Sequence, residues 1–206
     1  MELIRKYFPG ISRQQSLQFT ALMEILPRLN EKVNIISRKD IDHLEERHIL
    51  HSLAIARKFS FGPHTTVLDA GTGGGFPGIP LAILFPEAHF ILVDSTAKKI
   101  RIVGEIIQYL GLERVTPIWK RVEEMATIAD FVVSRAVAPL PALYDLTGSL
   151  IRKENRENMP NGLISLKGGD LEAELAPFRD RVQVFSIGEW FAEPFFSTKK
   201  VVYLKK

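Results

Sequence analysis

The segment TVLDAGTGGGFPGIP, residues 66–80, carries the strongest structural signal in the chain. A β-branched run ends at Asp69, five glycines follow within residues 71–78, and an apolar stretch comes next. Glycine permits positive φ and lets a ligand lie against bare backbone, while a helix N-terminus offers free N–H groups. A merely tight strand-to-helix turn needs far fewer glycines. The segment therefore predicts a strand, a loop that holds a nucleotide-type cofactor, and a helix.

The choice of cofactor depends on the details of this loop. Three glycines match the dinucleotide fingerprint G-x-G-x-x-G, at Gly73, Gly75 and Gly78. That match alone is weak, because the first glycine after the strand is Gly71, which leaves the fingerprint out of register. Pro77 removes an N–H donor, and Asp69 places negative charge near any diphosphate. The loop therefore favours a sulfonium cofactor without phosphates, in contact with Gly71 and Gly73.

Downstream of this loop, short β-branched runs alternate with helical patterns. We expect strands at residues 66–69, 90–94, 115–119, 131–134, 163–167, 182–185 and 200–204. We expect helices at residues 79–84, 97–110, 140–151 and 171–178. This alternation predicts an α/β fold: a Rossmann-like, seven-stranded, mostly parallel sheet with helices on both faces and a ligand crevice at the carboxyl ends of the strands. The last two strands are close in sequence, which suits an antiparallel final strand, and the polar residues 153–161 predict an exposed loop.

The first third of the chain has a helical texture. Ser12 is a candidate N-cap for an amphipathic helix at residues 13–29, and a second helix is expected at residues 42–58. The apolar positions of the first helix are Leu17, Phe19, Leu22, Ile25, Leu26 and Leu29. We therefore expect an N-terminal helical extension, residues 1–64, and a Rossmann-like domain, residues 65–206, in one compact unit.

Charge is unevenly divided between these two parts. Residues 1–64 hold 10 Lys and Arg against 7 Asp and Glu, whereas residues 65–206 hold 17 of each kind. A basic extension beside a neutral body suits a polyanionic partner, although on charge alone an ordinary solvated surface is the better interpretation.

The composition excludes several kinds of chemistry. There is no cysteine, which removes thiolate nucleophiles, sulfur-based zinc sites and iron–sulfur clusters. The five histidines do not form a metal signature, although His48 and His51 stand three apart on an expected helix, so we expect no metal. No long apolar run and no secretory leader are apparent, and we expect a cytoplasmic protein without membrane contact.

Residues beyond the glycine loop complete the expected cofactor site. Asp94 ends the second strand, where a carboxylate can accept both ribose hydroxyls, although it can equally cap the helix that follows. After the third strand, the backbone of Val122 and the carboxylate of Glu123 are placed to read an adenine edge. Phe76 can close the pocket, although a lone aromatic residue is more often part of the core.

Several segments together resemble one family, the bacterial small-subunit ribosomal RNA guanine-nitrogen-7 methyltransferases, also called glucose-inhibited division protein B. The matching segments are ERHILHSL (46–53), LDAGTGGGFPGIPLAI (68–83), PEAHFILVDSTAKK (86–99), RVEE (121–124), VVSRAVAPL (132–140) and LISLKGG (163–169). They span most of the chain in the family's order. Two segments depart from the family pattern, NIIS at 34–37 and the loop at 153–161.

The resemblance implies a class I S-adenosylmethionine-dependent methyltransferase that acts on a guanine in 16S ribosomal RNA, at the family's target position 527. It implies that S-adenosyl-L-methionine contacts a set of residues with Asp94 at the ribose: Gly71, Phe76, Val122, Glu123 and Arg135. The expected partner is 16S ribosomal RNA or the small ribosomal subunit, and we expect the protein to be a monomer.

Arg135 is the expected catalytic residue, because it stands at the carboxyl end of the fourth strand. Guanine nitrogen-7 exposes its lone pair and carries no proton, so direct in-line methyl transfer needs no general base and no covalent enzyme intermediate. After that strand the chain lacks the Asn/Asp-Pro-Pro-aromatic motif usual in amino-methylating enzymes. Arg135 is expected to bind the cofactor carboxylate, guanine oxygen-6 or a phosphate; the alternative is an ordinary salt bridge with Asp69 or Asp130.

Basic residues near loops or helix ends are nominated for RNA docking, although each can also be merely solvated: Arg47, His48, Lys98, Arg101, Arg121 and Lys167. Three other functions remain open. They are a small-molecule methyltransferase with the same cofactor site, an NAD-dependent oxidoreductase, and a non-catalytic RNA-binding protein with a vestigial loop. Comparing the binding of S-adenosylhomocysteine with that of NADH separates the second of these from the rest.

Overall fold

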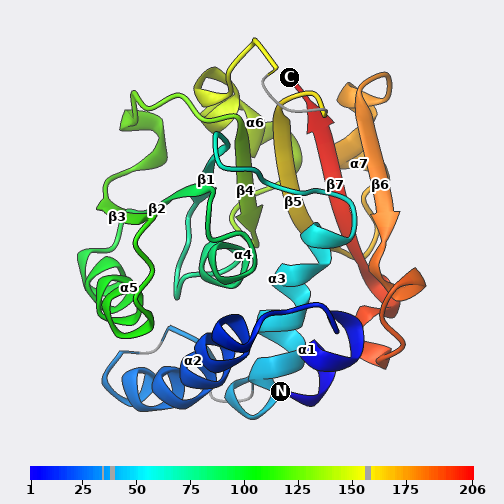
Figure 1. The fold of residues 1–206 in the computed structure, drawn as a ribbon. Helices are drawn as coiled ribbons and strands as arrows, with labels where there is room; N and C mark the ends of the chain where they lie inside the picture. The colour runs from blue at the N-terminus through cyan, green and yellow to red at the C-terminus, as the bar shows by residue number, and fades with distance from the viewer. Residues whose placement is uncertain (34, 38–39, 156–158) are drawn as a thin grey trace.

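The computed structural model describes residues 1–33, 35–37, 40–155 and 159–206. In this part of the chain seven strands form one sheet, in the order β3-β2-β1-β4-β5-β7-β6 (Figure 1). The strands are β1 Thr66–Ala70, β2 His89–Asp94, β3 Val115–Trp119, β4 Phe131–Arg135, β5 Gly162–Gly168, β6 Val182–Ser186 and β7 Lys199–Lys205. β7 runs antiparallel to β5 and β6, and the other pairings are parallel. The expected strands are confirmed to within one residue at each end, as is the antiparallel final strand.

Helices cover both faces of this sheet, as expected. Alternate residues of a strand point to opposite faces, and each face of the sheet packs on its own set of helices. Val67 and Phe131 belong to the core under the N-terminal helices and α4 and α5, whereas Leu68 and Val132 belong to the core under α6 and α7. Figure 1 shows α4 and α5 in front of the sheet and α6 and α7 behind it. Their bounds are α4 Gly78–Leu84, α5 Ala97–Leu110, α6 Leu140–Thr147 and α7 Glu172–Leu175.

The strand order reverses between β1 and β4. β1 pairs in parallel with β2 on one side and with β4 on the other, so the carboxyl ends of these strands meet at one edge. The chain leaves β1 and β4 in opposite directions there, which opens a crevice at the edge of the sheet. Gly71 follows β1 and Arg135 ends β4 at this edge. The fold therefore brings the glycine loop and the expected catalytic arginine together.

The N-terminal unit packs against α4 and α5 (Figure 1). It contains α1 Glu2–Tyr7 and α2 Arg13–Lys32, and Ser12 caps α2 as expected, in a reciprocal capping box with Gln15. The expected second helix is present but irregular: a 3₁₀ turn Ile41–His43, a π-helical segment Glu45–Leu50, α3 His51–Leu53 and a 3₁₀ turn Ala54–Arg57.

The apolar face of α2 joins the core of the sheet. Phe19, Leu22 and Leu26 are fully buried in the same hydrophobic cluster as the strands. Leu17, expected on this face, is instead 62% exposed. It stands two residues before Phe19, which is more than half a helical turn, so its side chain points away from the buried face. The extension thus shares one core with the rest of the chain, and its boundary at residues 64 and 65 stays a prediction.

Two expected helices are shorter than the sequence pattern indicates. The helix expected at 140–151 ends at Thr147, and after a 3₁₀ turn Ile151 forms a parallel bridge with Ala129. The Ala129 N–H donates to the Leu150 carbonyl oxygen, and the Arg152 N–H donates to the Ala129 carbonyl oxygen. The Leu150 and Arg152 groups are therefore used in this bridge and do not continue the helix. The helix expected at 171–178 divides into α7 and a 3₁₀ turn Ala176–Phe178, because Pro177 has no N–H to donate.

The polar loop expected at 153–161 is exposed at residues 153–155. Its last residue, Asn161, is buried, and its amide donates to the carbonyl oxygens of Arg152 and Glu154. Residues 156–158 and part of the segment 34–37 lie outside the described residues. Within the described ranges no helix is long and apolar enough to cross a membrane, and no group of three or more His, Asp or Glu side chains is arranged to hold a metal ion.

Candidate active site

Asp69, the fourth residue of β1, ties the glycine loop together. Its fully buried carboxylate accepts hydrogen bonds from the Thr72 hydroxyl, at 2.6 Å, and from the Gly78 N–H, at 2.8 Å. A Cβ atom at position 78 would lie 2.7 Å from the Asp69 oxygen, so this close approach requires glycine. Asp69 therefore fastens the start of α4 to β1. The carboxylate is buried under the loop and does not line the cleft described below, and the expectation that it places charge near a diphosphate stays a prediction.

Replacing Asp69 with asparagine is expected to change how stability depends on pH. Burial raises the pKa of the Asp69 carboxyl from its ordinary value of 3.8 to about 7. Because the folded state binds more protons between these two values, the stability contributed by this group falls as the pH rises from about 4 to about 7. Asp69→Asn keeps an oxygen that accepts from the Gly78 N–H but carries no charge.

The measurement is urea-induced unfolding of both proteins at about pH 5 and about pH 7.5. The wild type should lose stability relative to Asp69→Asn as the pH rises. A stability difference that is the same at both pH values would contradict the raised pKa.

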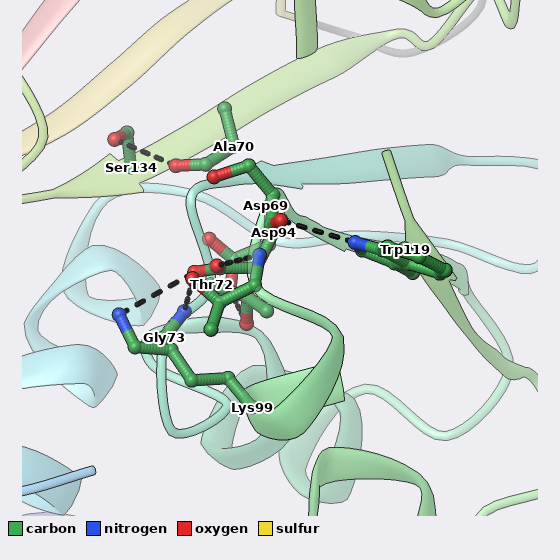
Figure 2. Close-up of polar contacts among 10 residues, drawn as sticks. Asp69, Ala70, Thr72, Gly73, Asp94, Lys99, Trp119 and Ser134 are labelled. Atoms are coloured by element: carbon green, nitrogen blue, oxygen red, sulfur yellow. Dashed lines mark hydrogen bonds and ion pairs between the residues drawn. The ribbon is translucent and has the colours of Figure 1, made fainter. Parts of the chain in front are cut away.

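A cleft of about 600 Å³ opens at the carboxyl ends of β1 to β4. Its walls bring together six residues predicted to contact a cofactor, namely Gly71, Gly73, Asp94, Val122, Glu123 and Arg135. Gly71 adopts a φ of 71°, and a Cβ atom there would lie 2.6 Å from a methyl group of Val137, so this part of the wall must be bare backbone. Beneath the cleft the Ser134 hydroxyl donates to the Ala70 carbonyl oxygen at 3.0 Å, which joins β4 to β1 (Figure 2).

Asp94 organises one wall of this cleft. One carboxylate oxygen accepts from the Thr96 N–H at 2.9 Å, and the other accepts from the Gly73 N–H at 3.0 Å, with the Lys99 ammonium 4.0 Å away (Figure 2). Asp94 does not cap α5, because the N-cap is Thr96 and no side chain caps this helix. Asp94 instead holds the turn before α5, and its carboxylate has further lone pairs to offer a ligand. The side chain is 8% exposed and lines the cleft.

The opposite wall is formed by Val122 and Glu123, in the 3₁₀ turn Val122–Glu124 after β3. Trp119, which no motif indicated, ends β3 and contacts Ser95, one of the residues that line the cleft. Trp119 is 66% exposed, and its indole N–H donates to the Ser95 carbonyl oxygen at 3.0 Å (Figure 2). It pairs in register with Asp94 of β2. The only signal in the sequence is a large aromatic residue at the end of a strand.

Arg135 stands at the end of β4 and is held from three sides. One terminal nitrogen donates to Nδ1 of His48 at 2.9 Å, the other donates to the Arg47 carbonyl oxygen at 3.3 Å, and the guanidinium lies 4.9 Å from the ring centre of Phe76. Burial lowers the pKa of Arg135 to about 10, which leaves it cationic at neutral pH. Among the described residues it forms no ion pair with Asp69 or Asp130, and Asp130 pairs with Arg152 instead. The ordinary salt bridge considered for Arg135 is therefore wrong.

His48 and Phe76 support Arg135 and lie outside the cleft lining. Burial, and then the nearby Arg135 charge, lower the pKa of His48 to about 4. The imidazole is therefore neutral at physiological pH and accepts the arginine hydrogen bond. Phe76 is 3% exposed, with its ring centre 5.3 Å from that of His48. A direct contact of either side chain with RNA or cofactor stays a prediction.

The remaining residues nominated for RNA docking fall into two groups. Lys98, Arg101 and Arg121 are exposed, although Arg101 lies 3.6 Å from Glu105 and Arg121 lies 3.8 Å from Glu123. Arg47 is partly exposed and pairs with Asp40 at 2.9 Å. The Lys167 ammonium is already engaged, because it donates to the Ala138 carbonyl oxygen at 2.6 Å and to Glu174 at 2.9 Å. The exposed group and Arg47 are thus the better placed for a large partner.

Comparison with known proteins agrees with this geometry. The family model GidB, rRNA small subunit methyltransferase G, matches residues 15–200. Ribosomal RNA small subunit methyltransferase G of Phocaeicola vulgatus is 52% identical over 204 residues, which cover 99% of this chain and 98% of the relative. The protein of the same name from Bacteroides thetaiotaomicron is 53% identical over 203 residues, 98% of each chain.

Among solved structures, a SAM dependent methyltransferase from Aquifex aeolicus superposes with a TM-score of 0.57 at 18% identity, covering 82% of this chain and 98% of that chain. This likeness concerns the fold, and it confirms the expected Rossmann-like class I architecture. With a family match over most of its length and full-length relatives at about half identity, the chain belongs to the GidB family of small subunit rRNA methyltransferases.

Proposed function

We propose that this protein transfers the methyl group of S-adenosyl-L-methionine to nitrogen-7 of a guanine in 16S ribosomal RNA, at the family's target position 527. The observation that carries the proposal is the position of Arg135. Arg135 lines the cleft of about 600 Å³ and also a second cavity of about 370 Å³. A side chain shared by two adjoining spaces can contact a cofactor in one and a substrate in the other.

The cleft suits a cofactor without phosphates. The N–H groups of Gly73 and Gly78 are already donated to Asp94 and Asp69. Those of Gly75 and Phe76 both go to the Thr72 carbonyl oxygen. Because these four donors are used inside the loop and Pro77 has none, the loop offers a diphosphate few free N–H groups, which argues against the NAD-dependent alternative. The remaining lone pairs of Asp94 suit ribose hydroxyls, and the turn at Val122 and Glu123 suits an adenine edge.

The residues around the reacting atoms bind and orient rather than exchange protons. When bound, the cofactor supplies an electrophilic methyl group on a sulfonium. Arg135 holds a positive charge and hydrogen-bond donors at the end of β4, and His48 and Phe76 fix its direction. Arg135 donates to guanine oxygen-6 or to a carboxylate or phosphate, which leaves nitrogen-7 free to attack. Holding the two reactants in line is worth up to ~7 to 11 kcal/mol of the barrier in favourable cases.

The proposal includes a monomeric enzyme that works in the cytoplasm on 16S ribosomal RNA or the small subunit. Exposed Arg121 lines the cleft, and exposed Lys98 is next in sequence to Lys99, which also lines it, so a polyanion can approach there. Size-exclusion chromatography with light scattering checks the monomer.

Incubation of the protein with small-subunit particles that lack the modification, and with methyl-labelled cofactor, tests the function. We expect one label per particle, and mass spectrometry should assign it to nitrogen-7 of one guanine in 16S RNA. Free nucleosides and small-molecule acceptors should remain unlabelled. Ribosome binding without label would support the non-catalytic alternative, and label on a small molecule alone would support the other methyltransferase class.

A further inference from the structure

The second cavity lined by Arg135 has no role in cofactor binding as described above. It has a volume of about 370 Å³ and lies between the N-terminal unit and the adjoining ends of β5 and β7. We call it the basic cavity, after the residues that dominate its lining: Arg47, His48, His51, Arg135, Phe195 and Lys199. The Arg47 guanidinium lies 5.7 Å from the centre of the Phe195 ring, and the Lys199 ammonium lies 4.8 Å from it.

The charge of the basic cavity is strongly positive. Arg47, Arg135 and Lys199 contribute cationic groups to it. Among the described residues, the one carboxylate in its lining belongs to Asp40, whose two oxygens already accept from Arg47 and from the Ser37 hydroxyl. An anion that enters the cavity therefore meets cationic hydrogen-bond donors, and the Asp40 carboxylate that could repel it is already paired.

Two buried nitrogens in this lining have no hydrogen-bond partner within the described structure: Nε of Arg47 and Nε2 of His51. Unpaired buried polar atoms are costly, and they are common where a ligand supplies the missing bond. His51 is only 7% exposed, and its ring hydrogen-bonds to the Arg47 backbone, so the neutral ring offers Nε2 as an acceptor. Nε of Arg47 thus lacks a hydrogen-bond acceptor, and Nε2 of His51 lacks a hydrogen-bond donor.

A ribose–phosphate unit has both of the missing groups. A phosphate oxygen accepts from Arg47 and Lys199, and a ribose 2′-hydroxyl donates to a neutral imidazole nitrogen. We infer that the basic cavity binds a ribose–phosphate unit of the substrate RNA strand, beside the nucleotide whose base is methylated. The inference rests on the proposed function for the identity of the strand. It assigns RNA contacts to His51, Phe195 and Lys199, and it gives Arg47 a phosphate as its ligand.

The phosphate contact is tested by Lys199→Gln, with Lys200→Gln as the matched control. The two lysines are consecutive in β7, so their side chains point to opposite faces, and the Lys200 ammonium donates to the Gly169 carbonyl oxygen instead. The affinity for an RNA fragment that carries the target loop is measured at several salt concentrations. Lys199→Gln should weaken binding and reduce the slope of log K against log salt by about 1, whereas Lys200→Gln should leave the slope unchanged.

Arg47→Gln is a second test of the phosphate contact, and it should lower the slope in the same way. The affinity for S-adenosylhomocysteine is measured for each variant as a further control and should not change. Thermal unfolding excludes general destabilisation. Equal slopes for Lys199→Gln and Lys200→Gln overturn the inference, and so does a loss of cofactor affinity without a loss of RNA affinity, because the cavity would then hold the cofactor's carboxylate.

The 2′-hydroxyl contact is tested first on the RNA, with the wild-type protein unchanged. Single 2′-deoxy substitutions are scanned through the target loop, and one position at or next to the methylated guanine should raise KM several-fold with little change in kcat. In His51→Leu that same substitution should have no further effect. Tolerance of 2′-deoxy at every position overturns the ribose contact. These outcomes test the cavity when the wild-type protein methylates RNA. If the wild type binds RNA but transfers no methyl group, the proposed function is refuted and the inference about RNA binding in the cavity is not.

Discussion

Arg135→Ala is expected to lower the rate constant for methyl transfer to RNA by about 100-fold to 1000-fold, while the protein still folds and binds cofactor analogues. The side chain ends β4 at the junction of the two cavities and presents a fixed positive charge and directed donors there. Such pre-oriented charge is worth most where water is excluded. The measurement is single-turnover transfer of labelled methyl to the RNA, at saturating concentrations of both reactants. Unchanged turnover would remove Arg135 from the reaction.

Two controls separate chemistry from structure in this variant. Arg135→Lys keeps a charge but not the planar pair of donors, so it should recover only part of the activity. In Arg135→Ala the pKa of His48 should rise, because the Arg135 charge that helps to depress it is gone. An NMR titration of the His48 ring measures this shift directly. A rise in the pKa with an intact fold shows that the loss of activity does not come from unfolding.

Asp94→Ala is expected to weaken the binding of S-adenosylhomocysteine by about 100-fold or more. The carboxylate is the acceptor proposed for the ribose hydroxyls, and hydrogen bonds to charged groups are worth about 1.5 to 3 kcal/mol each. The substitution also frees the Gly73 and Thr96 N–H groups that the carboxylate now accepts, so the glycine loop loses its tie to β2. Isothermal titration calorimetry measures the affinity.

Two further substitutions sharpen this second prediction. Asp94→Asn keeps one acceptor oxygen and should fall between the wild type and Asp94→Ala. Glu124→Gln removes an exposed carboxylate from the turn after β3 that does not line the cleft, so its affinity should equal that of the wild type. An Asp94→Ala protein with wild-type affinity would show that the ribose is held elsewhere.

The sheet, and the meeting of the glycine loop with Asp94, Val122 and Glu123 in one cleft, could be predicted because their signals are local. Each buried strand is a short β-branched run, and the glycine loop has a strand before it and a helix after it. Asp94, Val122 and Glu123 follow because carboxyl ends of neighbouring parallel strands meet at one edge. None of these inferences requires knowledge of contacts between residues distant in sequence.

The rest of the site depends on contacts that no local pattern contains. The His48 and Arg135 side chains are 87 residues apart in sequence, so the sequence suggested RNA contact for His48 rather than an arginine partner. The sequence suggested that the Lys167 ammonium is available to RNA, but in the structure it donates to Glu174 and to the Ala138 carbonyl oxygen. Asp69 looked like a charge at the cleft, because the burial of its carboxylate depends on how closely α4 approaches β1.

Arg135 lines both the cleft and the basic cavity. If cofactor or RNA moves the Arg135 side chain on binding, the binding of one cannot be energetically independent of the binding of the other. Whatever factor the RNA adds to the affinity for the cofactor, the cofactor must add to the affinity for the RNA, since the coupling free energy is reciprocal. His48 and Arg47 hold the Arg135 guanidinium from the N-terminal unit. The helical extension therefore holds the side chain through which the two ligands would be coupled.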